Sequence, residues 1–439
     1  MSITRKARVY IPKEERMKKI AIVCALFAVV AGFAFAGGGK EAASGSAGKT
    51  KLTVWGRDLP DDGADHAYIK ALVTGFQAAN PDIELEYIAL GDPGLMDKTK
   101  IAMAADQAPD IVQSWGGSVM GGYADAGRLL DLTSELSAIP GSKAASAAMS
   151  WKGKTYGIAP FFAIAGIFLN EGIFKAQGLK APTTIAEMEA TCDKLLAAGI
   201  QPFACGAKDK WPPLAMYMYL VNRVGGNAFG SAQGRSLGFD SDAFVKAAQI
   251  YQKWVAKGYF GSKPLGESYD DSQQQMATGK AAMQVTGSWM CANFANKEFT
   301  DQTIGFYAFP VLEGGVGKAT DCMGMTDIGF IATAKAKDKK EAVVRFFKYA
   351  MSVEVCSAEP GRICSVPGVK APSALTGMAS TVFTKAESVQ FWWDQDLPPT
   401  VTSPLNDAIQ TFFIPGTDVK QELVKFEKLM VENVGPVKK

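Results

Sequence analysis

Residues 51–114 contain the pattern that decides the fold, and they read KLTVWGRDLPDDGADHAYIKALVTGFQAANPDIELEYIALGDPGLMDKTKIAMAADQAPDIVQS. Three short segments have the composition or the alternation of strands, and two longer segments place apolar residues at helical spacing. The predicted strands are residues 51–55, 83–90 and 110–114, and the predicted helices are residues 65–80 and 95–107. Strands that alternate with helices are typical of a parallel sheet covered by helices on its faces. The stretch therefore predicts an α/β fold.

A second α/β part follows farther along the chain of 439 residues. Residues 161–169 form a nearly continuous apolar run, as expected of a strand covered on both sides. Thr184 and Glu187 have the spacing of a capping box, in which a hydroxyl and a carboxylate each accept a hydrogen bond from a backbone N–H at the start of a helix. Further helices are predicted at residues 242–257, 338–351 and 417–431. A chain of this length suits two or three domains.

The N-terminal residues have the pattern of a secretory signal. A basic region ends at Lys19, an apolar run follows, and Ala34 and Ala36 provide the small residues that a signal peptidase accepts. We predict a signal peptide at residues 1–36 and a flexible lead, rich in Gly, Ala and Ser, at residues 37–51. Cys24 lies inside the apolar run rather than at the cleavage site, which favours a soluble periplasmic protein over a lipoprotein. An uncleaved anchor and a start at Met17 stay open as alternatives.

The net charge and the residue types that the chain contains exclude several classes of function. The chain has a net charge of +2, but its first 36 residues contain seven basic and two acidic residues, so the remainder is slightly acidic. A slightly acidic body lacks the basic footprint of a nucleic-acid-binding protein. His66 is the only histidine and no C-x-x-C occurs, so we expect no metal site and no cofactor. The single histidine also argues against histidine-based catalytic triads. A carboxylate pair for glycoside hydrolysis leaves no local motif and stays open.

Tryptophans follow the predicted strands at the edge where open α/β sheets bind ligands. Trp55 ends a predicted strand and Trp115 directly follows one, and each leads into a glycine; Trp289 follows an apolar run and Gly287. Sugars present C–H faces that stack on aromatic rings, and their hydroxyls require polar partners. This mixture predicts a carbohydrate site. The candidate ligand-binding residues are Trp55, Arg57, Asp58, Trp115, Gly116, Trp211, Trp289 and Trp393.

Several short blocks occur in an order that resembles a known family. They are residues 76–83 (FQAANPDI), 108–112 (APDIV), 123–133 (YADAGRLLDLT), 152–160 (KGKTYGIAP), 169–174 (LNEGIF), 279–283 (GKAAM) and 287–289 (GSW). In this order they resemble family 1 extracellular solute-binding proteins of bacterial ABC importers, the group that includes the maltose-binding protein. The resemblance covers nearly the whole chain after the predicted signal peptide.

The resemblance implies a non-enzymatic, monomeric protein of two α/β lobes that close on a carbohydrate and deliver it to the membrane permease subunits of an ABC importer. It implies a periplasmic-binding-protein fold with the ligand cleft between the lobes. The N-terminal lobe would contain residues 52–160 and 312–372, and the C-terminal lobe would contain residues 161–311 and 373–439. In the family, the tryptophans at the positions of Trp115 and Trp289 commonly contact sugar.

The chain also departs from the family pattern. The maltose-binding protein has an Asp-Arg pair three residues after the first of these tryptophans, where this chain has Ser118 and Val119. A Tyr-Asn pair is replaced by Leu169 and Asn170. Maltose is therefore not supported as the ligand, and the choice of sugar stays open. The alternatives are a glycosidase and a binding protein for another solute, such as a glycerol phosphodiester, a metal chelate or a polyamine.

Overall fold

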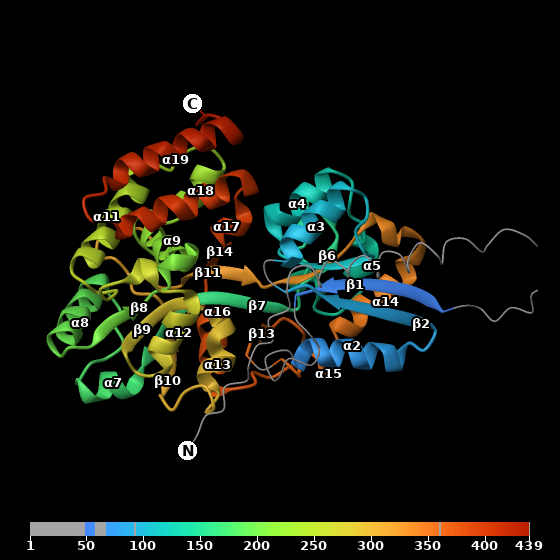
Figure 1. Cartoon of the computed structure of the whole chain (residues 1–439), viewed down its shortest axis with the longest axis horizontal. Helices are drawn as coiled ribbons and strands as arrows, with labels where there is room; N and C mark the ends of the chain where they lie inside the picture. Colours follow the sequence, from blue (N-terminus) through green and yellow to red (C-terminus); the bar gives the residue numbers. More distant parts are fainter. Residues whose placement is uncertain (1–48, 58–66, 92–93, 360, 439) are drawn as a thin grey trace, which may run out of the picture. The chain divides into compact units, whose positions relative to one another are not determined.

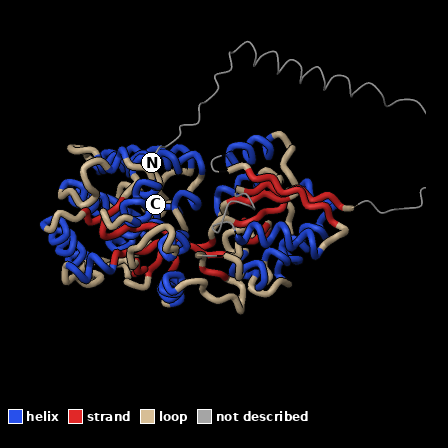
Figure 2. Tube along the Cα trace, turned by 60° about the horizontal axis from the view of Figure 1, so that its bottom comes forward, coloured by secondary structure: helices blue, strands red, loops and turns tan. Residues whose placement is uncertain are grey.

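The structure is a computed structural model that describes residues 49–57, 67–91, 94–359 and 361–438. Its described part contains two large β-sheets with helices packed on them, the two-lobed α/β arrangement expected from the sequence (Figures 1 and 2). The predicted signal peptide, residues 37–48 of the predicted lead, Asp58 and His66 lie outside the described residues. Residue 50, which we expected in the lead, belongs to the first strand, as does residue 51, where the predicted lead and the predicted strand overlap.

The sheet of the first lobe has the strand order β2-β1-β3-β12-β6. Its strands are β1 (Thr50–Gly56), β2 (Ile83–Ala89), β3 (Ile111–Ser114), β6 (Gly157–Ile158) and β12 (Gly329–Ala332). Strand β1 runs parallel to both β2 and β3, which confirms the predicted β-α-β-α-β order. Strand β12 joins β3 and β6 in antiparallel orientation.

The first-lobe helices cover this sheet. They are α2 (Ala67–Ala79), α3 (Gly94–Ala104), α4 (Gly117–Asp125), α5 (Thr133–Ser137), α6 (Ser142–Ala145), α14 (Lys340–Ala350) and α15 (Val353–Cys356). Ile69, Leu72 and Phe76 of α2 are buried, as their helical spacing predicts. Asn80 ends this helix before Pro81, and its side-chain amide donates to the Phe76 carbonyl oxygen at 2.9 Å.

The sheet of the second lobe has the order β14-β11-β7-β9-β8, and β10 and β13 also pair with β7. Its strands are β7 (Phe161–Asn170), β8 (Gln201–Ala204), β9 (Ala281–Gly287), β10 (Ile304–Tyr307), β11 (Asp321–Thr326), β13 (Ile363–Cys364) and β14 (Ser388–Gln390). Every residue of β7 is buried, which confirms the prediction of a strand covered on both sides. A separate two-stranded ribbon pairs β4 (Ser150–Trp151) with β5 (Lys154–Thr155).

Most of the helices belong to the second lobe. They are α7 (Glu171–Ala176), α8 (Ile185–Ala197), α9 (Pro212–Gly225), α10 (Ala228–Gln233), α11 (Asp242–Ala256), α12 (Tyr269–Ala277), α13 (Cys291–Ala295), α16 (Ala374–Thr384), α17 (Trp393–Asp396), α18 (Pro399–Gln410) and α19 (Val419–Asn433). Helix α8 begins with the predicted capping box, in which Glu187 N donates to Thr184 Oγ1 at 3.1 Å. The helices predicted around residues 242–257, 338–351 and 417–431 are α11, α14 and α19.

The chain passes between the sheets at three places. The first of these crossing points agrees with the expected lobe boundaries, and the other two differ from them. The first passage joins β6 to β7, as expected. The second joins β11 to β12, and the third joins α15 to β13. Strands β11 and β13 lie within residues 312–372, which we expected in the first lobe, but both pair with β7 in the second sheet. Among the described residues, no helix is long and apolar enough to cross a membrane.

Candidate ligand-binding site

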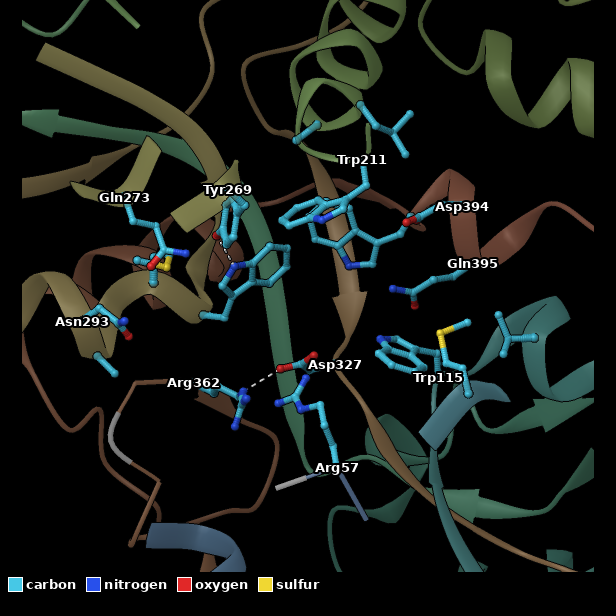
Figure 3. A pocket seen from close by; sticks show the side chains of 18 of the residues that line it. Arg57, Trp115, Trp211, Tyr269, Gln273, Asn293, Asp327, Arg362, Asp394 and Gln395 are labelled. Atoms are coloured by element: carbon cyan, nitrogen blue, oxygen red, sulfur yellow. Dashed lines mark hydrogen bonds and ion pairs between the residues drawn. The ribbon is translucent and has the colours of Figure 1, made fainter. Parts of the chain in front are cut away.

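A pocket of about 620 Å³ is lined by residues of both lobes and of the passages between the sheets (Figure 3). This volume is within the usual range for small-molecule sites, about 300–1,000 Å³. The first lobe contributes Arg57, Met96, Trp115 and Val119. The passages between the sheets contribute Asp327, Glu359 and Arg362. The second lobe contributes Trp211, Leu214, Ala215, Tyr269, Gln273, Trp289, Met290, Ala292, Asn293, Trp392, Asp394, Gln395 and Thr402.

The second lobe presents a contiguous set of four rings, which we call the aromatic wall: Trp211, Tyr269, Trp289 and Trp392. The ring centroids of Trp211 and Tyr269 are 4.5 Å apart, and those of Trp289 and Trp392 are 5.4 Å apart. Trp211 and Trp289 connect the two pairs at 6.0 Å. Each ring therefore restricts the rotation of its neighbour, and the wall is ordered before any ligand arrives.

Hydrogen bonds fix the orientation of Trp289. Its Nε1 donates to Tyr269 Oη at 2.7 Å, and Tyr269 Oη also lies 3.0 Å from Thr286 Oγ1. Burial raises the pKa of Tyr269 to about 12, so this hydroxyl stays protonated at neutral pH. A Cβ on Gly287 would lie 2.1 Å from the Trp289 ring, so only glycine allows the ring to fold over the end of β9. Because the indole N–H is already bonded, Trp289 offers a ligand its ring face.

Trp115 approaches the pocket from the first lobe. It directly follows β3, and its carbonyl oxygen accepts a hydrogen bond from Ser114 Oγ at 3.0 Å. The next residue, Gly116, packs so tightly that a Cβ there would lie 2.2 Å from the Ala148 carbonyl oxygen. In Figure 3, Trp115 and Gln395 lie on one side of the pocket, and Gln273 and Asn293 lie on the other.

Charged side chains at the passages between the sheets form a third part of the pocket. Arg362 Nε lies 2.6 Å from Asp327 Oδ2, and Arg362 Nη1 lies 2.9 Å from Glu359 Oε2. All three side chains are largely buried, with 18, 14 and 4% of the Arg362, Asp327 and Glu359 side chains exposed. Such burial is tolerated because opposite charges are paired. Arg57 lies beside this cluster (Figure 3), and its backbone N–H donates to Gln113 Oε1 at 2.7 Å.

Asp394 is the acidic residue of the pocket on the second-lobe side. It lies near the start of α17, and desolvation raises the pKa of its carboxyl group to about 6. Its own backbone N–H and that of Gln395 act in the opposite direction, because hydrogen bonds from them favour the ionised form. A carboxyl group with this pKa can accept hydrogen bonds from ligand hydroxyls and also changes its protonation state near neutral pH.

Of the residues predicted from sequence, Arg57, Trp115, Trp211 and Trp289 line the pocket together. Trp55 and Gly116 do not line it: Trp55 packs half-buried against the first-lobe core, and Gly116 holds the loop after Trp115 against Ala148. Asp58 lies outside the described residues.

Trp393 requires a correction. It is fully buried in the second-lobe core, where its ring stacks on Phe229 with centroids 4.5 Å apart. Its Nε1 donates to Gln390 Oε1 at 2.9 Å. The adjacent Trp392 lines the pocket instead, because the chain enters α17 between the two residues and their side chains diverge.

The selection of candidates from sequence missed several lining residues. Asp327, Glu359 and Arg362 come together only through the passages between the sheets, and no spacing rule connects them. Tyr269 belongs to a helix that begins with a capping box at Ser268, a signal for the helix but not for the pocket. Within the described ranges, no group of three or more His, Cys, Asp or Glu residues could hold a metal ion.

Comparison with known proteins identifies the family. The sequence profile of the bacterial extracellular solute-binding proteins matches residues 60–355. The multiple sugar-binding protein of Streptococcus mutans is 25% identical over 376 residues, which cover 80% of this chain and 87% of that protein. The maltodextrin-binding protein of Bacillus subtilis is 25% identical over 338 residues, 76% of each chain.

Similar structures have also been solved. One, from work on xylan utilization by the thermophilic bacterium Caldanaerobius polysaccharolyticus, has a TM-score of 0.78 and 25% sequence identity. It covers 86% of this chain, which in turn covers 99% of it. The family match extends over more than half of the chain, across segments of both lobes and most of the pocket. The chain therefore belongs to the family of bacterial extracellular solute-binding proteins.

Proposed function

We propose that this protein is an exported receptor that captures a neutral carbohydrate in the pocket and delivers it to the permease of an ABC importer. The observation that carries this proposal is the aromatic wall of four rings in the same pocket as Trp115 of the opposite lobe. Aromatic faces stack on the C–H faces of sugar rings, and the amides of Gln273, Asn293 and Gln395 supply partners for hydroxyls. The names of the two relatives compared above, a multiple sugar-binding protein and a maltodextrin-binding protein, support the same ligand class.

The charges of the pocket favour a neutral ligand. Of the residues that the structure describes, two arginines and three carboxylates line it, so these groups sum to −1 with Asp394 ionised and to zero with Asp394 protonated. A glycerol phosphodiester would require an excess of positive charge, because a buried phosphate needs compensation. A polyamine would require carboxylates available to cations, whereas Asp327 and Glu359 are both paired with Arg362.

Hydrolysis of a glycoside is the second candidate, and the raised pKa of Asp394 is the observation that favours it. A general acid in a glycosidase needs a pKa near the working pH, and it needs a second carboxylate across the scissile bond. The other two carboxylates of the pocket already bind Arg362. This arrangement supports binding without turnover.

A ligand screen tests the proposal. Melting temperatures are measured with neutral mono- and oligosaccharides, and with a glycerol phosphodiester, a polyamine and a uronic acid as comparison ligands. A ligand present at 100 times its Kd stabilises the protein by about 2.7 kcal/mol. We expect stabilisation by a neutral sugar. Stabilisation by a charged ligand alone would contradict the proposal. Prolonged incubation with the best sugar, followed by product analysis, separates binding from hydrolysis.

Export is the other part of the proposal and has its own test. The basic, apolar and small-residue pattern of residues 1–36 supports a signal peptide, and the extracellular family supports secretion. N-terminal sequencing of protein recovered from the periplasm should begin at Gly37. Recovery from the cytoplasm, or an acylated N-terminus, would contradict this part of the proposal and leave the ligand assignment untouched.

A further inference from the structure

The loop after Trp115 makes a direct contact with the opposite lobe. The Ser118 hydroxyl, in the first turn of α4, shares its one proton between the Gln395 carbonyl oxygen, at 2.8 Å, and the Leu397 carbonyl oxygen. Both acceptors lie at the end of the four-residue helix α17, where backbone carbonyls have no partner within the helix. The Ser118 residue is only 8% exposed, so water has little access to these groups.

Gly117 allows the backbone to come this close. It has a φ of +63°, a conformation that glycine adopts without strain. A Cβ at this position would lie 2.6 Å from the Phe391 ring and 2.7 Å from the Gln395 carbonyl oxygen. Gly116 differs, because a Cβ there would meet Ala148 of its own lobe. Gly116 thus serves the folding of the loop, and Gly117 serves its contact with the second lobe.

The two sides of this contact belong to different hydrophobic cores. Helix α4 is anchored by Met120, which packs in a first-lobe cluster with Val112 and Ile331. Residues 391–397 are anchored by Trp393 and Leu397, which pack in the large second-lobe cluster. The contact therefore connects two bodies that are each held together independently.

The contact also lies at the edge of the pocket. Trp115 and Val119 on one side, and Asp394 and Gln395 on the other, all line the pocket, whereas Ser118 does not. Ser118 stands where the maltose-binding pattern has the first residue of an Asp-Arg pair. In this chain, the hydroxyl at that position is directed at the backbone of the second lobe.

We propose that Gly117 and Ser118 form a latch, which closes the lobes on each other by docking against residues 391–397. The proposal rests on the proposed function, since its purpose would be to retain a captured ligand. The latch contacts exist only when the lobes meet at this edge, so they stabilise the closed conformation and not the open one. Because the apparent affinity scales with the population of the binding-competent state, loss of the latch weakens binding without any change in ligand contacts.

The first test compares two serines. Ser118→Ala removes the hydroxyl of the latch, and Ser150→Ala is the control. Ser150 Oγ donates to the Ser146 carbonyl oxygen at 2.8 Å within the first lobe, so its loss leaves the contact between the lobes intact. We expect the sugar to dissociate about threefold to tenfold faster from Ser118→Ala, the range that corresponds to one hydrogen bond. Ser150→Ala should dissociate at the wild-type rate. Equal rates for the two variants would overturn the latch.

The second test compares two glycines and needs no sugar. Gly117→Ala places a methyl group against Phe391, whereas Gly127→Ala, at a φ of +69°, meets no atom within 4 Å. Both variants place an alanine at a similar positive φ, +63° and +69°, but only Gly117→Ala meets atoms of the opposite lobe. We expect small-angle X-ray scattering of the sugar-free protein to show a larger radius of gyration for Gly117→Ala than for Gly127→Ala. Identical radii would overturn the latch.

The two tests separate the latch from the carbohydrate assignment. If no sugar binds the wild-type protein, the proposed function fails, and the scattering comparison alone decides the latch. If a sugar binds and both pairs of variants behave alike, the proposed function stands and the latch is wrong. Melting curves of all four variants show that each comparison is made between folded proteins.

Discussion

Among the described residues, the second lobe presents four aromatic rings to the pocket, whereas the first lobe presents one. The rings of the aromatic wall contact one another, and Trp289 is further fixed by its hydrogen bond to Tyr269. Trp115 lies instead in a loop with two glycines, held by backbone hydrogen bonds and by packing on the first-lobe core. One face of the pocket is thus ordered by side-chain packing and the other by its backbone.

This difference indicates that the two lobes contribute to sugar binding in different ways. A surface that is ordered in advance loses little conformational entropy when a sugar stacks on it. A loop that carries one ring and docks through a glycine and a serine hydroxyl is suited to close over a ligand already held. We therefore expect substitutions within the aromatic wall to act on ligand contacts and stability together, and substitutions in the first-lobe loop to act on binding alone.

The largest effect is expected for Trp393→Ala, which removes a buried ring behind the aromatic wall. Replacement of a fully buried tryptophan by alanine lowers the free energy of unfolding by about 3–5 kcal/mol. The ring lies outside the pocket, so the main loss should be in stability. A smaller loss of affinity is expected, because Trp393 anchors the residues against which Ser118 docks. Urea denaturation and calorimetry at low temperature measure the two quantities. A large loss of affinity with unchanged stability would return Trp393 to the ligand site.

Trp289→Ala should have the next largest effect, and it acts within the aromatic wall. If the sugar covers about 100 Å² of the ring, the lost burial corresponds to about 2.5 kcal/mol, or a loss of affinity of one to two orders of magnitude. The melting temperature should also fall moderately, because Trp211 and Trp392 lose a neighbour and Tyr269 loses a donor. Calorimetric titration with a melting curve tests both. Unchanged affinity would exclude Trp289 from the site.

Trp115→Ala tests the same difference between the lobes from the first-lobe side. A single ring that covers about 50 Å² of the sugar would contribute roughly tenfold in affinity. The melting temperature should stay close to the wild-type value, because the loop around Trp115 is held by backbone contacts to Ala148. A fall in melting temperature equal to that of Trp289→Ala would contradict the proposed difference between the lobes.

How far the sequence predicts the molecule depends on whether the signal is local. The helix with Ile69, Leu72 and Phe76, and the capping box at Thr184, depend on neighbouring residues, and the structure contains both. The strand-end rule also placed Trp115 and Trp289 at the pocket. Which of two adjacent tryptophans faces the pocket depends on the backbone direction at the start of α17, which no spacing rule expresses.

The charged part of the pocket is the clearest case of a non-local feature. Asp327 and Arg362 are separated by many residues and belong to two different passages between the sheets. Their ion pair forms only after both sheets are assembled. The expected lobe boundaries missed strand β11 for the same reason, because its partner β7 is far away in the sequence.

The smallest effect we predict is a dependence of affinity on pH through Asp394. Desolvation raises its pKa to about 6, so the carboxyl group is protonated below that pH and ionised above it. Sugar hydroxyls that donate to it favour the ionised form, so binding should lower the pKa and affinity should rise with pH. Each unit by which binding lowers the pKa corresponds to about tenfold in affinity. We expect binding about threefold to tenfold weaker at pH 5 than at pH 8.

Asp396 provides the matched control for this prediction. It lies on the same short helix, burial also raises its pKa, and it does not line the pocket. Asp394→Asn should remove the pH dependence of binding, whereas Asp396→Asn should keep it.

The free energy of unfolding of the sugar-free protein should depend on pH in the opposite direction, and should fall as the pH rises. A carboxyl group with a raised pKa is disfavoured in its ionised form, so the contribution of Asp394 is lost as the pH rises through about 6. Asp394→Asn should therefore melt at a higher temperature than the wild type at pH 8 and show a smaller difference at pH 4. The other charged groups of the pocket are Arg57, Arg362, Asp327 and Glu359, and they are present in both variants. A pH profile shared by Asp394→Asn and the wild type would show that the titrating group is not Asp394, and Asp394 would then have no role in recognising the sugar.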